Sequence, residues 1–347
     1  MPPAEDSLLQ ATRSHFDAVE DVRIEPIAKG GSDRKFYRVG LTRRRASGGG
    51  AMSLILVAYT AQKEENRHYV RIAQFLETIG VRAPKIFFHD EAAGLIWVED
   101  LGARDLWTFR PPAAGGHAAW PARRAYYQSA LEEIWRLHTR GWEGLARFKF
   151  TLQIEFNAAL YRWEQGYFFD HCLGRVFAGR VDPAAVARVA AEPVWGRIAE
   201  RLAAWPRVLV HRDFQSQNVI LHGEHAHLID FQGMRPGLAH YDLASLLHDP
   251  YARLPAEERG ALLDYYLALG VRKDLGPNRA RFDEIYALCA VQRLMQALGA
   301  YGFLGLVKEK PEFLPHVPVA LGSLREVAAT VPGLEAFSEL LAALPTA

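Results

Sequence analysis

The 347-residue sequence predicts an α+β fold of two lobes, a small antiparallel sheet in residues 1–100 followed by a mostly helical lobe in residues 101–347. Short apolar runs rich in β-branched and aromatic residues dominate the first hundred residues. Apolar residues at helical spacing dominate the remainder. Two short strands are nevertheless expected inside the second lobe, around the polar sequence HRDFQSQN. We place the lobe boundary near residues 99–101.

The first lobe is expected to contain five strands and one helix. The strands are expected, in chain order, at residues 22–27, 35–39, 52–59, 84–89 and 94–100. The turn KGGSDR separates the first two strands, and the glycine-rich sequence GLTRRRASGGG connects the second to the third. The helix is expected at residues 64–79, where apolar residues recur at helical spacing until Gly80 ends the pattern.

The second lobe is expected to consist mainly of helices. A stretch at residues 121–141 carries an apolar stripe and has a proline near its start, where a helix tolerates one. Further helices are expected at residues 152–173 and 185–205, the second interrupted by Pro193. Past Tyr241 the pattern is helical nearly to the end of the chain.

The composition is that of a soluble globular protein, with half the residues apolar and 23% charged. A formal net charge of +1 argues against nucleic acid or an anionic membrane as a partner. Cys172 and Cys289 lie far apart without metal-ligand spacing, which is typical of a reducing compartment. No secretory signal or membrane-length apolar run is present, so we expect a cytoplasmic protein, and we expect it to be a monomer.

The sequence HRDFQSQN carries the most specific chemical signal. Asn218 follows five residues after Asp213, and the next apolar run ends at Asp230, which is the spacing of a kinase catalytic loop and its metal-binding aspartate. Asp213 has the position of the carboxylate that orients an acceptor hydroxyl, whereas Asn218 and Asp230 offer oxygen ligands that suit Mg²⁺. Turn caps and surface carboxylates are the competing interpretation. The full spacing favours phosphoryl transfer, which depends on positioning and electrostatics.

Other features of the sequence are less specific. Gly30, Gly31 and Ser32 form a candidate phosphate-binding loop, because glycines permit close backbone approach and serine adds a donor; an ordinary hairpin turn is the alternative. The histidines of HGEHAH are expected in a solvated hairpin rather than a zinc site. Asp242 is expected to brace the catalytic loop from the following helix, and His211 is expected to be structural.

A protein kinase is a poor match to these motifs. The sequence has no G-x-G-x-x-G, and Gln232 stands where Asp-Phe-Gly would place its glycine. No Ala-Pro-Glu follows, and the interval between Asp230 and the helix at Tyr241 is too short for an activation loop.

The chain resembles the aminoglycoside phosphotransferase-like family, a bilobal protein-kinase-like fold, on the strength of GGSDRKFYRV, EFNAALYRWEQGYF, HRDFQSQNVI and LIDFQGMRPGLAHYDLASLLHDPY. Within this family it is most similar to the anomeric sugar kinases of bacterial cell-wall recycling, which phosphorylate N-acetylmuramate and N-acetylglucosamine at C1. The resemblance implies ATP and Mg²⁺ as cofactors and a small sugar as substrate.

The resemblance also implies roles for individual residues. It makes Asp213 the catalytic base and Asn218 and Asp230 the Mg²⁺ ligands. Its nucleotide contacts would be Gly30, Gly31 and Ser32 at the triphosphate, with backbone groups of Glu99 and Leu101 at the adenine. Candidates for sugar contacts, by position, are Trp163, Glu164, Tyr167, Gln232 and Arg235.

One departure concerns the third strand, where kinases generally carry a lysine that holds the nucleotide phosphates. The sequence LILVAYT has none, and we expect Arg34, Lys35 or Lys63 to supply this charge. An aminoglycoside kinase, or a kinase of another small hydroxyl metabolite, remains an alternative. So does a nucleotide-binding pseudokinase, which the missing lysine favours and the intact Asp213, Asn218 and Asp230 disfavour.

Overall fold

The computed structural model describes residues 5–17, 19–27, 34–43, 50–60, 64–148, 152–270 and 278–345. A five-stranded antiparallel sheet forms the first part of the chain, in the order β1-β2-β3-β5-β4. Its strands are β1 (Val19–Ile27), β2 (Lys35–Arg43), β3 (Ala51–Ala58), β4 (Ile86–Asp90) and β5 (Leu95–Glu99). The five predicted strands are therefore present, and hydrogen bonds join each to its neighbour.

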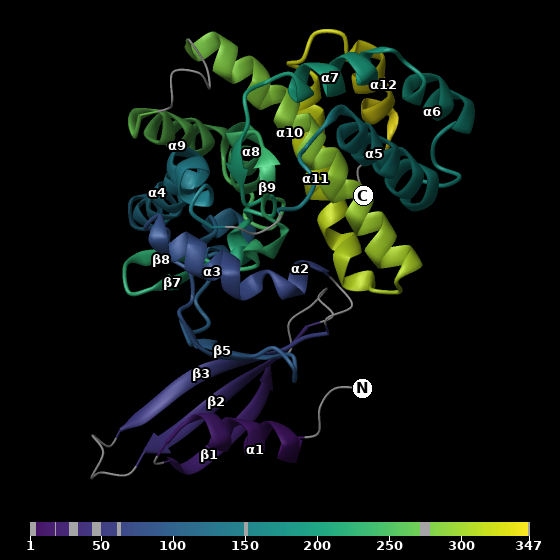
Figure 1. The fold of residues 1–347 in the computed structure, drawn as a ribbon. Helices are drawn as coiled ribbons and strands as arrows, with labels where there is room; N and C mark the ends of the chain where they lie inside the picture. Colours follow the sequence, from purple (N-terminus) through teal and green to yellow (C-terminus); the bar gives the residue numbers. More distant parts are fainter. Residues whose placement is uncertain are drawn as a thin grey trace.

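Helix α1 (Glu5–His15) covers one face of this sheet and was not predicted (Figure 1). Leu8 and Thr12 lie one helical turn apart and are buried against the sheet, where Trp97 donates its indole N–H to the Thr12 hydroxyl at 3.1 Å. On the same face, Val39 pairs with Leu54, and both are fully buried. The alternation along β2 and β3 thus points one set of side chains toward α1.

Helices α2 (Glu64–Arg67) and α3 (Tyr69–Thr78) connect β3 to β4 and pack against the helical part (Figure 1). A single apolar cluster joins Phe75 and Leu76 of α3, Val98 of β5, and Leu131 and Ile134 of α4 (Trp120–Leu145). This cluster is the main apolar connection between the sheet and the helices.

The rest of the chain is mostly helical, as predicted. Its longer helices are α4, α5 (Ala158–Phe168), α6 (Pro183–Ala190), α7 (Val194–Ala203), α8 (Ala239–Leu247), α9 (Ala256–Ala268), α10 (Arg279–Gly302), α11 (Val317–Ala328) and α12 (Glu335–Ala343). Pro193 separates α6 from α7, in agreement with the predicted interruption. The predicted start of α5 at residue 152 was wrong, because Asn157 caps the helix by accepting the Leu160 N–H at 2.9 Å.

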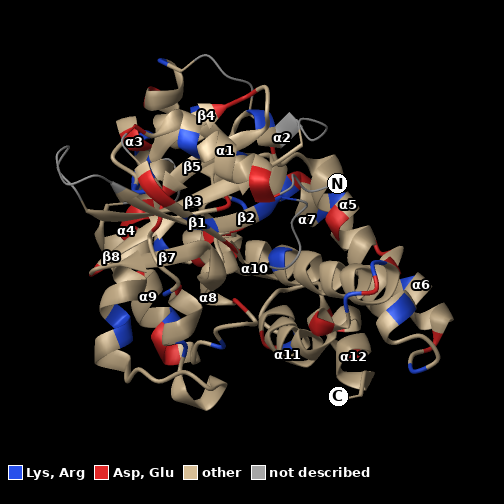
Figure 2. Cartoon of the chain, turned by 90° about the horizontal axis from the view of Figure 1, so that it is seen from below, with Lys and Arg blue, Asp and Glu red and all other residues tan. Residues whose placement is uncertain are grey.

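Two short strand pairs frame the polar sequence HRDFQSQN. Strand β6 (Val208–Val210) pairs with β9 (Arg235–Gly237), and β7 (Val219–His222) forms a hairpin with β8 (His225–Leu228). This segment therefore contains more than the two predicted strands, because Gly223, with φ +62°, turns the HGEHAH sequence back on itself. Basic and acidic residues are interspersed over the molecule (Figure 2). Within the ranges given above, no helix is long and apolar enough to cross a membrane.

Candidate active site

The loop between β6 and β7 is held by a buried carboxylate of α8. Asp242 accepts the backbone N–H of His211 at 2.7 Å with Oδ2 and that of Arg212 at 2.8 Å with Oδ1. Arg212 adopts φ +78°, a conformation that a residue with a side chain rarely occupies and that these bonds help to maintain. His138 of α4 also contacts Asp242, with Nε2 3.1 Å from Oδ2. Asp242 therefore braces the loop, as expected.

Asp213 and Asn218 meet within this loop. The Asn218 side chain donates from Nδ2 to the Asp213 carbonyl at 2.9 Å, which leaves its amide oxygen as the atom able to bind a ligand. The Asp213 carboxylate is 33% exposed, and one of its oxygens lies 3.6 Å from Arg212 Nη1. A buried amide thus fixes the loop while the carboxylate remains accessible.

Asp230 follows β8 and lies beside the loop. Ile229 donates its N–H to the Asn218 carbonyl at 3.0 Å, and the Ile229 carbonyl lies 3.0 Å from His211 Nε2. His211 therefore has the structural role expected of it. Asp230 itself adopts φ +63°, which turns the chain sharply after the strand. These contacts bring Asp230 to the loop that carries Asn218.

The guanidinium of Arg34, next to the sheet, contacts Asp230. Arg34, directly before β2 and 9% exposed, donates to Asp230 Oδ1 from Nη2 and to Gln232 Oε1 from Nη1 at 2.8 Å. Gln232 donates in turn to Asp230 Oδ1 at 2.9 Å. Burial alone would raise the pKa of Asp230, but the Arg34 charge and the Gln232 hydrogen bond hold that pKa below its ordinary value. The carboxylate is therefore negatively charged.

The other two residues proposed to replace the lysine of the third strand are Lys35 and Lys63. Lys35 belongs to β2 and is exposed. Lys63 and the candidate phosphate loop of Gly30, Gly31 and Ser32 lie outside the described residues. Among the predicted nucleotide contacts that are described, Glu99 donates its backbone N–H to the Lys85 carbonyl at 2.9 Å, which leaves only its carbonyl for an adenine. Leu101 is buried next to it.

A second buried carboxylate, just after α8, also holds the catalytic loop, and the sequence did not indicate a role for it. Asp249, two residues after the end of α8, accepts the backbone N–H of Ser216 at 2.8 Å and its hydroxyl at 2.5 Å. Burial raises the pKa of Asp249, although the bonds from Ser216 and Tyr251 act in the opposite direction. The sequence signal that could have indicated this contact is the position of Ser216, between Asp213 and Asn218 in the motif.

The aromatic helix α5 divides the predicted sugar contacts between its surface and its buried face. Trp163 is 56% exposed and stacks on Tyr167, with ring centroids 4.9 Å apart. Glu164 is buried and accepts hydrogen bonds from the Tyr241 hydroxyl and from Gln292 Nε2, both at 3.0 Å. Burial raises the pKa of Glu164 against the effect of these bonds. Its two oxygens thus join α5 to α8 and α10.

Arg235 of β9 lies within electrostatic range of the Glu164 and Asp213 carboxylates. Its guanidinium lies over the Phe156 ring at 5.4 Å, and its Nε donates to the Gly233 carbonyl at 3.2 Å. Burial and the nearby Arg212 lower the pKa of Arg235, whereas Asp213 acts in the opposite direction. Arg235 therefore belongs to the electrostatic surroundings of Asp213.

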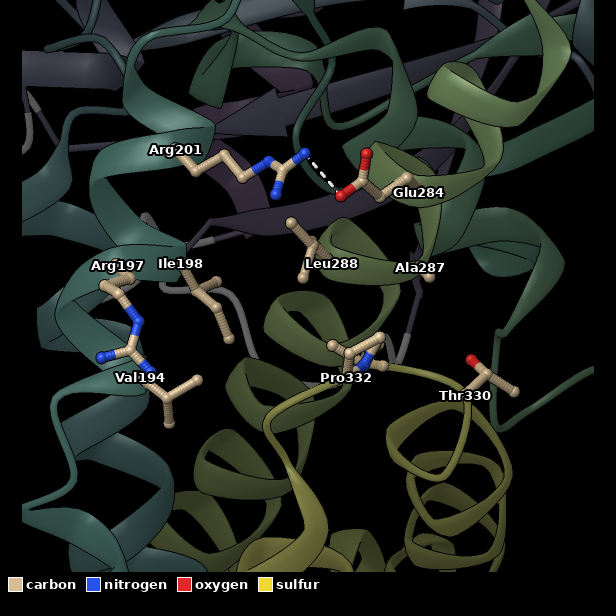
Figure 3. A pocket seen from close by; sticks show the side chains of 10 residues that line it. Val194, Arg197, Ile198, Arg201, Glu284, Ala287, Leu288, Thr330 and Pro332 are labelled. Atoms are coloured by element: carbon tan, nitrogen blue, oxygen red, sulfur yellow. Dashed lines mark ion pairs between the residues drawn. The ribbon is translucent and has the colours of Figure 1, made fainter.

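The HGEHAH hairpin and a cavity beside α7 lie apart from the predicted site. The HGEHAH sequence forms the turn of the β7–β8 hairpin, as expected, and in the described ranges no group of three His, Cys, Asp or Glu side chains is placed to hold a metal ion. A cavity of about 270 Å³ lies between α7, α10 and the turn after α11, where Arg201 pairs with Glu284 at 2.5 Å (Figure 3). None of its lining residues belongs to the predicted site.

Comparison with known proteins places the chain in a family. The sequence model described as "Phosphotransferase enzyme family" matches residues 23–285. An N-acetylmuramate/N-acetylglucosamine kinase of Pseudomonas aeruginosa is 26% identical over 333 residues, which cover 94% of this chain and 90% of the relative. A protein of the same name from Caulobacter vibrioides is 28% identical over 259 residues, covering 72% and 67%.

Solved structures share the fold. A choline/ethanolamine kinase family protein from Mesorhizobium loti superposes with a TM-score of 0.58 at 18% identity and covers 97% of this chain and 98% of its own. An amicoumacin kinase in complex with AMP-PNP and Ca²⁺ superposes with a TM-score of 0.59 at 14% identity, covering 95% and 96%. The similarity confirms a bilobal kinase-like fold with a small antiparallel sheet and a mostly helical remainder.

Proposed function

Because this chain belongs to the phosphotransferase enzyme family, we propose that it transfers the γ-phosphoryl group of ATP to the anomeric C1 hydroxyl of an N-acetylated amino sugar, either N-acetylmuramate or N-acetylglucosamine. The names of the relatives from P. aeruginosa and C. vibrioides support the choice of sugar. We assign the protein to the recycling of cell-wall sugars for the same reason.

The observation that carries this proposal is the geometry of the loop around Asp213. Its backbone is held by two buried carboxylates, Asp242 of α8 and Asp249 just after that helix, while the Asp213 carboxylate stays accessible at 33% exposure. We propose that Asp213 accepts the proton of the acceptor hydroxyl as its oxygen attacks the γ-phosphorus. An anomeric hydroxyl is more acidic than an ordinary alcohol, so Asp213 serves to orient it as much as to remove its proton.

Asn218 and Asp230 are the residues we propose to hold Mg²⁺. An amide oxygen and a carboxylate with a lowered pKa suit this ion, which keeps several waters and needs few protein ligands. Bound there, Mg²⁺ would neutralise charge on the phosphate oxygens.

The nucleotide is proposed to lie between the sheet and the catalytic loop. Gly30, Gly31 and Ser32 would line its triphosphate, and the Glu99 carbonyl and Leu101 backbone would contact its adenine. Arg34 would supply the charge that the strand lysine supplies in other kinases, because it already reaches Asp230. The lobe boundary near residue 100 is part of this proposal.

The acceptor sugar is proposed to bind on the helical side of Asp213. The exposed ring of Trp163, stacked on the half-buried ring of Tyr167, offers a flat apolar surface of the kind that packs against a sugar ring. Gln232, Arg235 and Glu164 would complete the site, Glu164 through its bond to Tyr241.

The proposal is tested by incubating the protein with ATP and a panel of acceptors, with and without Mg²⁺. The panel contains N-acetylmuramate, N-acetylglucosamine, an aminoglycoside and choline, and phosphorus NMR identifies the position of the phosphate. A Mg²⁺-dependent 1-phosphate of an N-acetylated sugar is expected. Phosphorylation of the aminoglycoside or choline alone would contradict the proposed substrate, and nucleotide binding without any turnover would indicate a pseudokinase.

A further inference from the structure

Arginine side chains that are buried in the described residues differ in how their charge is compensated. Arg34, Arg123 and Arg293 are each at most 9% exposed. Arg34 pairs with Asp230 and Arg123 with Glu258, so two of the three have a carboxylate partner. Arg293 has no carboxylate within 4 Å in the part of the chain that is described. Asp213 and Glu164 act on the Arg293 charge only from beyond ion-pair distance, and a buried guanidinium without a directly bonded anion is costly, so this arrangement points to a ligand.

The hydrogen bonds of Arg293 leave much of its donor capacity unused. Its Nε donates to the Ser245 hydroxyl at 3.0 Å, and its Nη1 donates to Gln296 Oε1 at 2.5 Å. Both partners are neutral, and a guanidinium has five N–H groups. Within the described residues, both N–H groups of Nη2 and one of Nη1 make no hydrogen bond to protein. Such an array suits a carboxylate, which accepts two parallel bonds.

The position of Arg293 relates it to the catalytic loop. Ser245, which anchors it, lies on α8 between Asp242 and Asp249, the two carboxylates that hold the loop. The adjacent Gln292 donates to Glu164 at 3.0 Å. The charge of Arg293 also lies within electrostatic range of Asp213 and Glu164. Arg293, on helix α10, therefore belongs to the electrostatic surroundings of Asp213, whereas Arg34 contacts Asp230.

We propose that Arg293 is a specificity-determining residue that binds the carboxylate of an acidic acceptor sugar, and so favours N-acetylmuramate over the neutral N-acetylglucosamine. This inference rests on the proposed function. The acceptor is the source of the anion because the phosphates are assigned to the sheet side, where Arg34 lies. A neutral sugar would leave Arg293 in its present state, in which its bonds to described residues are those to Ser245 and Gln296.

The test measures kcat/KM for both sugars, and their binding by calorimetry, in wild type, Arg293→Gln and Arg293→Lys. Arg293→Gln should lower kcat/KM for N-acetylmuramate at least about tenfold, because a charge-assisted bond is lost, and should change the value for N-acetylglucosamine less than about threefold. Arg293→Lys should restore part of the preference. Arg201→Gln, on α7 beside the remote cavity, is the matched control and should change neither value.

Several results would overturn the inference. An equal fall for both sugars would indicate a structural or phosphate-binding role, and thermal unfolding of each variant would separate these two. A loss of preference in Arg235→Gln but not in Arg293→Gln would assign the carboxylate to Arg235. If wild type phosphorylates neither sugar, the proposed function fails by itself. Calorimetry then decides the inference: weaker binding of the acidic sugar alone in Arg293→Gln supports it, and binding of neither sugar to wild type refutes it.

Discussion

Two residues of the candidate phosphoryl-transfer site, Arg212 and Asp230, occupy left-handed backbone conformations although neither is a glycine. Their φ values are +78° and +63°. Each is maintained by neighbours: Asp242 accepts the Arg212 N–H, and Arg34 and Gln232 hold the Asp230 carboxylate. Non-glycine residues persist in such conformations when their surroundings over-determine them, and they cluster at functional sites. Of the four non-glycine residues with positive φ in the described part of the chain, these two lie at the candidate site, whereas Arg253 and Glu309 lie elsewhere.

Replacing Asp213 with Asn is expected to abolish turnover while leaving nucleotide binding intact. The amide keeps the shape of the side chain but cannot accept the proton of the acceptor, an effect of about 10²–10⁴-fold on kcat. Steady-state kinetics and nucleotide titration measure the two quantities. Activity retained at the wild-type level would refute the assignment of Asp213.

Replacing Arg34 with Ala is expected to raise the KM for the nucleotide at least about tenfold, because a buried charge near the phosphates is removed. Arg34→Lys should retain part of the affinity. Lys35→Ala, an exposed neighbour on β2, is the matched control. Unchanged nucleotide KM values in Arg34→Ala, Lys35→Ala and Lys63→Ala would show that none of these residues replaces the strand lysine.

Helix α8 shows how one element serves both the core and the site. All nine of its residues are buried, and Asp242 and the following Asp249 hold the catalytic loop. The helix also carries His240, whose ring nitrogens have no hydrogen-bond partner among the described residues and whose ring lies 4.2 Å from that of Phe282. Burial, with a smaller effect of His138, lowers the pKa of His240 to about 3. His240 is therefore neutral at neutral pH.

This buried histidine should make the protein sensitive to acid. Between its folded pKa of about 3 and its ordinary value of 6.5, the unfolded chain binds one proton more than the folded chain, so stability falls as the pH falls below 6.5. His240→Phe should remove about 2 kcal/mol of the stability lost between about pH 7.5 and about pH 5. Urea denaturation at both pH values measures the difference.

The exposed His225 provides the control for this measurement, since His225→Phe should leave the loss of stability unchanged. An identical loss in wild type and His240→Phe would mean that other groups account for the acid sensitivity. His248, at the end of the same helix, also has a pKa that burial lowers to about 3, so part of the sensitivity should remain in His240→Phe.

At the scale of the whole molecule, Asp100 connects the sheet to the chain that leads into the helices. Its carboxylate accepts Arg38 Nε of β2 at 2.8 Å and the Ser53 hydroxyl of β3 at 2.5 Å, and it accepts the Gly102 N–H at 3.0 Å. Burial opposes ionisation, but the bonds from Arg38, Ser53 and Gly102 lower the pKa of Asp100 overall. The ionised carboxylate of Asp100 thus fixes the segment that joins the sheet to the helices.

Asp100→Ala is expected to reduce the free energy of unfolding by about 1–3 kcal/mol, because Arg38 and two further donors lose their partner. It should also raise the nucleotide KM, since the adjoining Glu99 and Leu101 are proposed to contact the adenine. Chemical denaturation and kinetics measure both effects. Asp21→Ala, which breaks an exposed pair with Arg23, is the control and should cost less than about 1 kcal/mol. Equal effects of the two substitutions would contradict this role of Asp100.

The sequence by itself determined the sheet, the helical remainder and the loop of Asp213 and Asn218, because these depend on periodicity or on spacing within one short segment. It missed α1, whose single buried turn makes a weak pattern, and misplaced the start of α5. Only the tertiary structure decided that Arg34 meets Asp230, that Asp249 holds Ser216 and that Arg293 pairs with no carboxylate of the described residues. The residues of each such contact lie tens to hundreds of positions apart, so the packing of whole elements, rather than local propensity, brings them together.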